Sequence, residues 1–439
     1  MHTRSKVVKV IFLIAVAAIP VASFSQSYQT WRGSPPSTST QTSNWTQAGL
    51  NDFLKQINTI TTAVPFLMIT PDSRAGGMGE TGVATAPDVN SIHWNPAKLA
   101  FADKKMGVGI SYTPWLRALV PDINLAYVSF YDKLDKNSAF GVSLRYFSMG
   151  NITFTDAVGN TIGQFRPNEY AVDGCYSRKL GKYFSAGMAA RIIRSNLTNG
   201  ITVAGQDTKT GTAAAVDLSG YYHNNDLKVS GKKSTLMIGL AITNIGNKMS
   251  YSTSVHRDFI PINLRLGGGM TIEADDYNEI SFQLEFNKLL VPSPPIYEIG
   301  ANGSPVIDPN TGQPVILHGK DPNRSVPAGI LGSFNDAPGG YKEELREINP
   351  CFGIEYWYSH IFAIRTGYFY EAPTKGNRQY ITLGAGVKYN VFGLDFAYLI
   401  PTNGQRSPLQ NTLRFTLTFD FDAFKNQKDD STPDGGSAK

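Results

Sequence analysis

The stretch FGVSLRYF, residues 140–147, decides the fold of this chain. Phe140, Val142, Leu144 and Tyr146 alternate in it with small, charged or further aromatic residues. Because successive side chains of a β-strand point to opposite faces, one face of this segment is apolar and the other is more polar. A strand of a soluble sandwich alternates in the same way, so the fold class depends on how often the pattern recurs.

About fourteen segments of roughly eight to eleven residues repeat the alternation, which is typical of a transmembrane β-barrel. Beyond the N-terminal leader, no run of about twenty apolar residues could cross a membrane as a helix. Aromatic residues are abundant, with 21 Tyr and 24 Phe, as expected where they gather at the lipid interfaces. We therefore predict an all-β fold, a transmembrane antiparallel β-barrel of about 14 strands. The predicted strands are residues 105–114, 123–131, 139–148, 169–179, 183–194, 213–222, 235–244, 261–273, 279–288, 351–359, 361–371, 379–389, 393–400 and 411–421.

Residues 1–25 have the composition of a cleaved signal peptide. Basic residues precede an apolar stretch of about ten residues, and Ser23 and Ser25 stand before Gln26. That stretch is too short to cross a bilayer of about 30 Å as a helix. We therefore expect export of the mature chain to the outer membrane. Without the leader the formal net charge falls from +5 to +2, so the basic pI predicts no nucleic-acid partner.

The remaining chain divides into four parts. Residues 26–63 are rich in Ser, Thr and Gln, and residues 45–60 carry apolar side chains at helical spacing, which predicts a periplasmic arm with one short amphipathic helix. Residues 64–104 are too Gly-rich for a helix and too irregular for a strand, which favours a plug or hatch. The barrel follows at 105–421, and residues 422–439 are a charged segment that we expect to be a disordered periplasmic tail.

The connections between the predicted strands are alternately short and, for the most part, longer, and bacterial barrels place short turns in the periplasm and longer loops outside. The predicted short turns are 132–137, 181–182, 274–278, 359–360 and 390–392, with a slightly longer one at 224–233. One extracellular connection, 289–350, is far longer than a loop requires. It carries apolar residues that either pack into the barrel mouth or dock on another protein, namely Ile296, Tyr297, Val315, Ile316, Leu317, Ile330, Leu331 and Phe334.

No pattern of catalytic or ligand-binding residues emerges. Residues 77–82 match G-x-G-x-x-G, but Pro71 interrupts the strand that a dinucleotide site needs before them. The six His include no i, i+4 pair, so a zinc motif of the H-E-x-x-H type is absent. We therefore expect no enzyme, no catalytic residue, no cofactor and no metal.

Charged side chains fall on the polar face of several predicted strands, and we expect them to pair inside the lumen. They are Arg145, Asp173, Arg191, Asp217, Arg265 and Glu285. Cys175 and Cys351 fall on the same face but far apart in strand order. A disulfide needs Cα atoms within about 7 Å, so two buried thiols are expected instead.

The segment AVPFLMITPDSRAGGMGETGVATAPDVNSIHWNPAKLAF, residues 63–101, carries a family resemblance. Its Ser73–Gly82 stretch and Asn95-Pro96-Ala97 resemble the N-terminal plug of FadL-like barrels, which have fourteen strands. The sequence of the whole segment resembles the PorV family, which are FadL-like proteins of the type IX secretion system of Bacteroidetes. The family's plug residues correspond to Gly76, Gly77, Gly79, Trp94, Asn95 and Pro96, whose role we interpret as structural rather than catalytic.

The resemblance implies a non-enzymatic role in protein transport. PorV-like barrels dock on a very large translocon barrel, bind the C-terminal signal domain of secreted cargo, and carry it to a cell-surface attachment complex with a sortase-like protease. The alternative is a FadL-type outer-membrane channel for hydrophobic small molecules such as long-chain fatty acids, released to the outer-membrane lipid through a gap in the wall. The plug resemblance supports both, and the sequence leaves the cargo and the contact loops open.

Overall fold

The fold is described from a computed structural model, which covers residues 57–115, 122–155, 158–159, 161–200, 207–252, 257–300, 304–403 and 412–421. The predicted signal peptide, most of the predicted arm and the whole predicted tail lie outside these residues.

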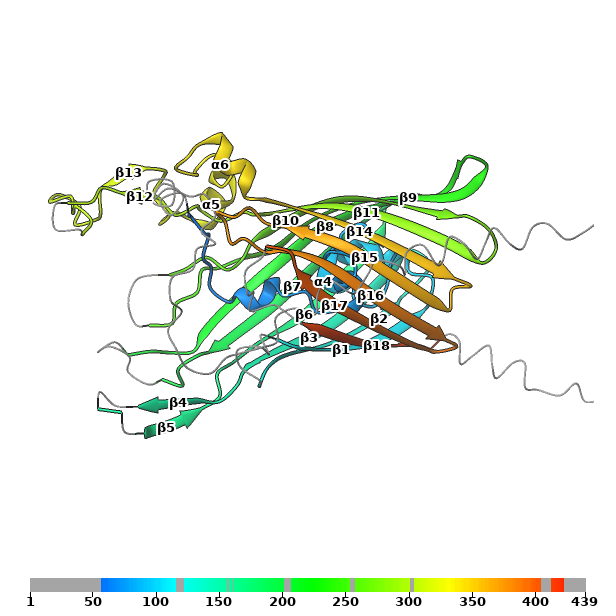
Figure 1. The fold of residues 1–439 in the computed structure, drawn as a ribbon, viewed down its shortest axis with the longest axis horizontal. Coiled ribbons are helices and arrows are strands. Elements are labelled where there is room, and N and C mark those ends of the chain that lie inside the picture. Colours follow the sequence, from blue (N-terminus) through cyan, green and yellow to red (C-terminus); the bar gives the residue numbers. More distant parts are fainter. Residues whose placement is uncertain are drawn as a thin grey trace, which may run out of the picture. The chain divides into compact units, whose positions relative to one another are not determined.

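Fourteen antiparallel strands close into one barrel (Figure 1), which confirms the predicted fold class. The strands are β1 (Met106–Pro114), β2 (Ile123–Lys133), β3 (Ser138–Met149), β6 (Asn168–Lys179), β7 (Phe184–Asn196), β8 (Gly211–Val229), β9 (Lys232–Gly246), β10 (Asn263–Glu273), β11 (Asn278–Leu289), β14 (Ile348–Tyr358), β15 (Phe362–Tyr370), β16 (Gln379–Tyr389), β17 (Phe392–Pro401) and β18 (Leu413–Asp420). Each lies where the sequence predicted a strand, and β1 pairs with β18, with Gly107 opposite Asp420, to close the barrel.

The alternation of side chains has the predicted orientation. In β3, Val142, Leu144 and Tyr146 are exposed on the outer surface, whereas Ser143 and Arg145 are buried inside. The outer surface of the barrel is therefore apolar and the lumen is polar, as a lipid environment requires. Among the described residues, no helix is both long and apolar enough to cross a membrane.

The β8–β9 connection differs from the prediction. We expected a turn at residues 224–233, but β8 continues to Val229 and β9 begins at Lys232. Ser230 and Gly231 make the turn with φ of 50° and 76°, the left-handed pair that suits a two-residue hairpin. The polar run at Asn224 suggested a loop, but a register shift between Asn224 and Leu227 accommodates it within the strand.

The long connections contain further short elements. Residues 150–167 include the hairpin β4 (Ile152–Thr155) and β5 (Thr161–Phe165). The predicted loop 289–350 includes β12 (Ile296–Tyr297), β13 (Ile316–His318), α5 (Val326–Gly332) and α6 (Tyr341–Arg346). We call residues 290–347 the loop cap. It lies at the end of the barrel opposite the short turns (Figure 1).

The chain before β1 occupies two places. Residues 57–63, which we call the strap, lie at the same end as the loop cap, where the backbone N–H of Asn58 donates to Thr374 O at 2.9 Å. The luminal segment, residues 64–104, then crosses the lumen through η2 (Pro65–Met68), α3 (Ser73–Gly76), α4 (Ser91–Trp94) and η3 (Pro96–Phe101) before β1 begins.

The predicted arm is described only at residues 57–63. Residues 57–60, the end of the predicted helix, are not helical, and the rest of that helix lies outside the described residues. The strap lies at the long-loop end rather than beside the short turns. The position of β1 does not fix that of the strap, because the luminal segment joins them through the whole depth of the barrel.

Candidate functional site

The luminal segment touches strands all around the barrel. Its backbone or side chains bond to Thr416 in β18, Thr382 in β16, Glu285 in β11 and Gly220 in β8. All six residues singled out from the sequence, Gly76, Gly77, Gly79, Trp94, Asn95 and Pro96, are buried in it. The structure therefore brings the predicted residues together inside the barrel.

Asp72 organises the first part of the segment. One carboxylate oxygen accepts from Ala75 N at 2.9 Å and caps α3, as Asp does at helix N-termini. The other accepts from Trp94 Nε1 at 2.7 Å. Asp72 thus links α3 to the end of α4. We did not single out this residue, although an Asp placed before a short helix is a recognisable capping signal.

Asn95 joins the segment to the wall. Its side-chain amide donates to Val83 O at 2.9 Å and to Gly220 O at 3.1 Å, and its side-chain oxygen accepts from Ala97 N. The residue is 0% exposed. Pro96 follows at the first position of η3, where a missing N–H costs nothing. The Asn-Pro pair therefore ends α4 and starts η3.

Two glycines allow the segment to approach the wall. Gly79 has φ of 65°, and a Cβ there would lie 2.5 Å from Phe352 O and 2.6 Å from Tyr368 N. A Cβ at Gly77 would lie 3.0 Å from the Cα of Gly384. Only glycine fits at position 79 without displacing the backbone of β14 or β15.

A row of alternating charges connects the segment to three strands. Arg74 donates to Asp88 Oδ2 at 2.9 Å and to both carboxylate oxygens of Glu355 at 2.8 and 3.0 Å. Arg365 donates to Glu355 at 2.7 Å and to Asp395 at 2.6 Å. Because buried charges need partners, this network fixes α3 against β14, β15 and β17. The sequence analysis did not identify it.

Five of the six luminal charges predicted to pair do so. Arg191 is paired with Asp173 and Asp217, and Arg265 with Glu285. Glu285 also accepts from the backbone N–H of Gly82 and Val83. Arg145 instead donates to Leu67 O at 2.7 Å. These side chains therefore hold the luminal segment as well as one another.

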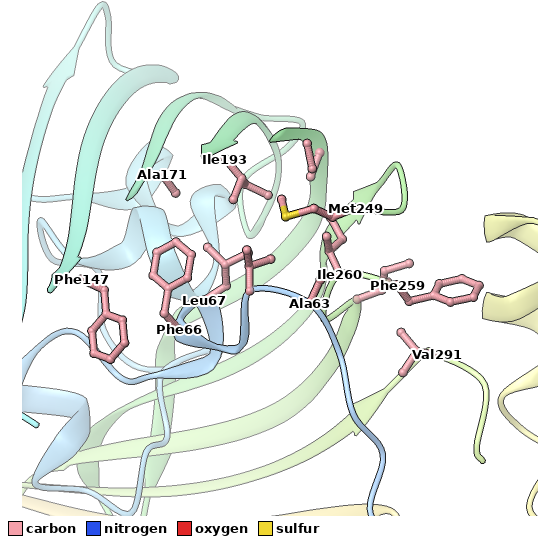
Figure 2. Close-up of a cluster of buried hydrophobic side chains, with 14 of the residues drawn as sticks. Ala63, Phe66, Leu67, Phe147, Ala171, Ile193, Met249, Phe259, Ile260 and Val291 are labelled. Atoms are coloured by element: carbon pink, nitrogen blue, oxygen red, sulfur yellow. The ribbon is translucent and has the colours of Figure 1, made fainter. Parts of the chain in front are cut away.

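Some apolar residues of the loop cap are buried against the barrel, and others are exposed. A buried apolar cluster at the barrel mouth includes Ala63, Phe66, Phe147 and Phe259 (Figure 2). Ile330 packs against this cluster. Its neighbour Leu331 is 77% exposed. Of the other apolar residues singled out from the sequence, Ile296, Leu317 and Phe334 are exposed, and Tyr297, Val315 and Ile316 are half-buried. Packing at the barrel mouth thus describes Ile330, whereas docking of the exposed residues on another protein stays a prediction.

Two cavities flank η2 at the barrel mouth. One of about 260 Å³ is lined by residues that include Thr59, Ile60 and Lys375. The other, of about 220 Å³, is lined by residues that include Phe66 and Trp115. Met68 and Arg378 border both, so η2 separates two spaces near the outer end of the lumen.

Cys175 and Cys351 are buried free thiols, in agreement with the prediction. In the part of the chain that the structure describes, no group of three or more His, Cys, Asp or Glu residues is placed to hold a metal ion.

Several solved structures are similar to this chain in fold. The crystal structure of the Ralstonia pickettii toluene transporter TbuX shares 12% identity over 80% of this chain and 97% of that chain, with a TM-score of 0.43. A Pseudomonas aeruginosa FadL homologue shares 10% identity over 83% and 99%, also with a TM-score of 0.43. Similarity at this level carries no argument about function. Among curated proteins no sequence matches.

A family profile gives a direct match. The profile described as type IX secretion system protein PorV covers residues 53–296, which include the strap, the luminal segment and the first nine strands of the barrel wall. The matched range is more than half of the chain. Together with the closed barrel, it shows that this outer-membrane protein belongs to the PorV family of the type IX secretion system.

Proposed function

We propose that this protein is a non-enzymatic carrier in type IX secretion. In this proposal it docks on the large translocon barrel, binds the C-terminal signal domain of secreted cargo, and delivers the cargo to the sortase-like surface attachment complex. The observation that carries the proposal is the family match. The loop cap supports it, since exposed apolar side chains on a folded surface are typical of protein-binding sites.

The exposed face of the loop cap is the part we assign to the partner. Leu331 lies on α5, Phe334 follows the end of α5, and Tyr341 and Leu345 lie on α6. All four are exposed. The cap itself is held in place from beneath by Ile330 and its contacts with the mouth cluster. Substitution of Leu331 or Tyr341 therefore changes the binding surface without removing the support of the cap. Phe334 is less suitable, because its ring centroid lies 5.9 Å from Lys288 Nζ.

Paired substitutions test this assignment. The double variant Leu331→Asp/Tyr341→Asp is expected to reduce cargo secretion and recovery of the translocon barrel on purification, at unchanged levels of folded barrel. Val158→Asp is the control, since Val158 is 82% exposed on the β4–β5 connection. A coarser test deletes residues 300–340. Normal secretion and normal translocon association in both would refute the assignment.

The alternative is a channel for hydrophobic small molecules such as long-chain fatty acids. The two cavities at the mouth favour it, because aromatic residues line one and Arg378 borders both. Purification in mild detergent through a tag on Lys439, followed by mass spectrometry, separates the two functions. A very large barrel protein with secreted cargo supports the carrier, whereas a lone barrel with bound fatty acid supports the channel.

A further inference from the structure

The strap and the loop cap meet at Asn58. Its side-chain amide donates to Pro294 O at 3.0 Å and to Glu343 Oε1 at 2.9 Å, both in the cap. Its backbone N–H donates to Thr374 O at 2.9 Å, in the β15–β16 loop. One residue of the strap therefore bonds to two different loops, and both loops are far from the strap in the sequence.

A buried ionic cluster lies beside this contact. Lys375 Nζ is 2.6 Å from Glu343 Oε1 and 2.9 Å from Glu347 Oε1. Lys288 Nζ is 2.6 Å from Glu347 Oε2 and 3.1 Å from Glu344 Oε2. Burial alone would raise the pKa of Glu343, but its bonds with Lys375 and Asn58 hold the pKa below the usual value. Glu343 is therefore ionised at neutral pH, and its contact with Lys375 is an ion pair.

The same carboxylates hold the cap in its own fold. Glu344 Oε1 accepts from the backbone N–H of Asp336 at 2.6 Å and of Ala337 at 2.8 Å. Glu347 Oε1 accepts from Ser293 Oγ at 2.6 Å. We call Asn58, Lys288, Glu343, Glu344, Glu347 and Lys375 the latch. Glu343 accepts from Asn58 of the strap and is paired with Lys375. Moving the cap therefore breaks the hydrogen bond that holds the strap, and withdrawing the strap removes a donor from Glu343.

The far end of the strap is tied to the cap through the β9–β10 loop. Ala63 N donates to Phe259 O at 2.9 Å. The Phe259 ring packs directly under α5, since a Cβ at Gly329 would lie 2.7 Å from it. The strap is thus held at both ends by groups that also contact the cap, and between them Thr59 and Ile60 line the cavity of about 260 Å³.

We propose that the strap and the loop cap form one latched lid over the barrel mouth. A protein that displaces the cap withdraws the strap with it and opens the cavity beside Lys375. The identity of the displacing protein rests on the proposed function, whereas the coupling of strap and cap does not. Binding of a partner to the cap would in this way move the strap, which continues into the luminal segment.

Hydrogen exchange on the full-length protein in detergent tests the coupling. Lys375→Met is expected to speed exchange at least tenfold at the strap amides of Asn58 and Ala63 and at the cap amides of Asp336 and Ala337. Lys182→Met is the matched control, since Lys182 forms an exposed pair with Asp226 at the short-turn end. Faster exchange in the cap with an unchanged strap would overturn the proposal. Asn58→Ala, a milder change, is expected to raise exchange at Ala337 as well, and no change there would also count against it.

A reversible lock tests the consequence for secretion. Asn58→Cys/Thr374→Cys replaces two residues whose backbones are hydrogen-bonded, and the native thiols are buried. The oxidised variant is expected to lose secretion and regain it with reductant, while the single variant Asn58→Cys secretes normally. Normal secretion by the oxidised double variant would refute withdrawal of the strap. Failure of the wild-type protein to associate with a translocon would refute the proposed function alone, because the exchange result is independent of it.

Discussion

At the scale of single residues, Asn95 shows how an amide specifies the luminal segment. Asn95→Asp replaces a donor to two carbonyl oxygens, those of Val83 and Gly220, by a carboxylate that repels them. A buried charge without a partner costs about 3 kcal/mol or more. We expect less folded barrel, measured as the heat-modifiable band on gels, with no selective loss of secretion per folded molecule. Asn225→Asp, at an exposed site, is expected to fold normally.

The two close-packed glycines give a ranked prediction. Gly79→Val places a Cβ within 2.6 Å of backbone atoms at φ of 65°, and Gly77→Val places one at 3.0 Å. Both are expected to lower the yield of folded barrel, and Gly79→Val more strongly. Gly174→Val, on the outer surface of β6, is the control, because a Cβ there would have no other atom within 4 Å. Equal yields for all three variants would contradict the packing argument.

At the scale of elements, α5 presents neighbouring residues to different environments. Ile330 packs on the mouth cluster, whereas Leu331 is exposed. Ile330→Asp is expected to loosen the cap, because burying an unpaired charge in an apolar site is costly, and limited proteolysis should cut the cap much faster. Leu331→Asp should leave the cleavage rate unchanged. Equal cleavage of both variants would show that α5 does not support the cap.

At the scale of the whole molecule, the charge row of Arg74 holds the segment and the wall together. Arg74→Met leaves Glu355 and Asp88 without one partner each, and breaking a buried ion pair costs about 3–5 kcal/mol. We expect a lower unfolding midpoint in detergent and transient conductance in planar bilayers, as the segment loosens within the lumen. Lys182→Met, which breaks an exposed pair, should change neither. A conductance equal to that of the wild-type protein would contradict this role.

The sequence predicted the fold far better than it predicted the site. The alternation around Val142 and Arg145 assigns each side chain to lipid or lumen without reference to any other strand, so all fourteen strands were found. The same alternation identified the luminal charges of β6, β7 and β8. The Gly-rich motif and Asn95 were recognised through a family resemblance, but the role of Asp72 in capping α3 was not.

By itself, then, the sequence determined the barrel, the polarity of its two faces and the location of the luminal segment in the chain. Only the tertiary structure decided the partners of Arg74, the side on which the strap lies, and the division of the loop cap into a buried and an exposed face. These depend on contacts between distant residues, such as Arg74 with Glu355, 281 positions apart, and Asn58 with Glu343, 285 positions apart. Local periodicity carries the direction of a side chain, whereas its partner is set by how the closed barrel brings remote segments together.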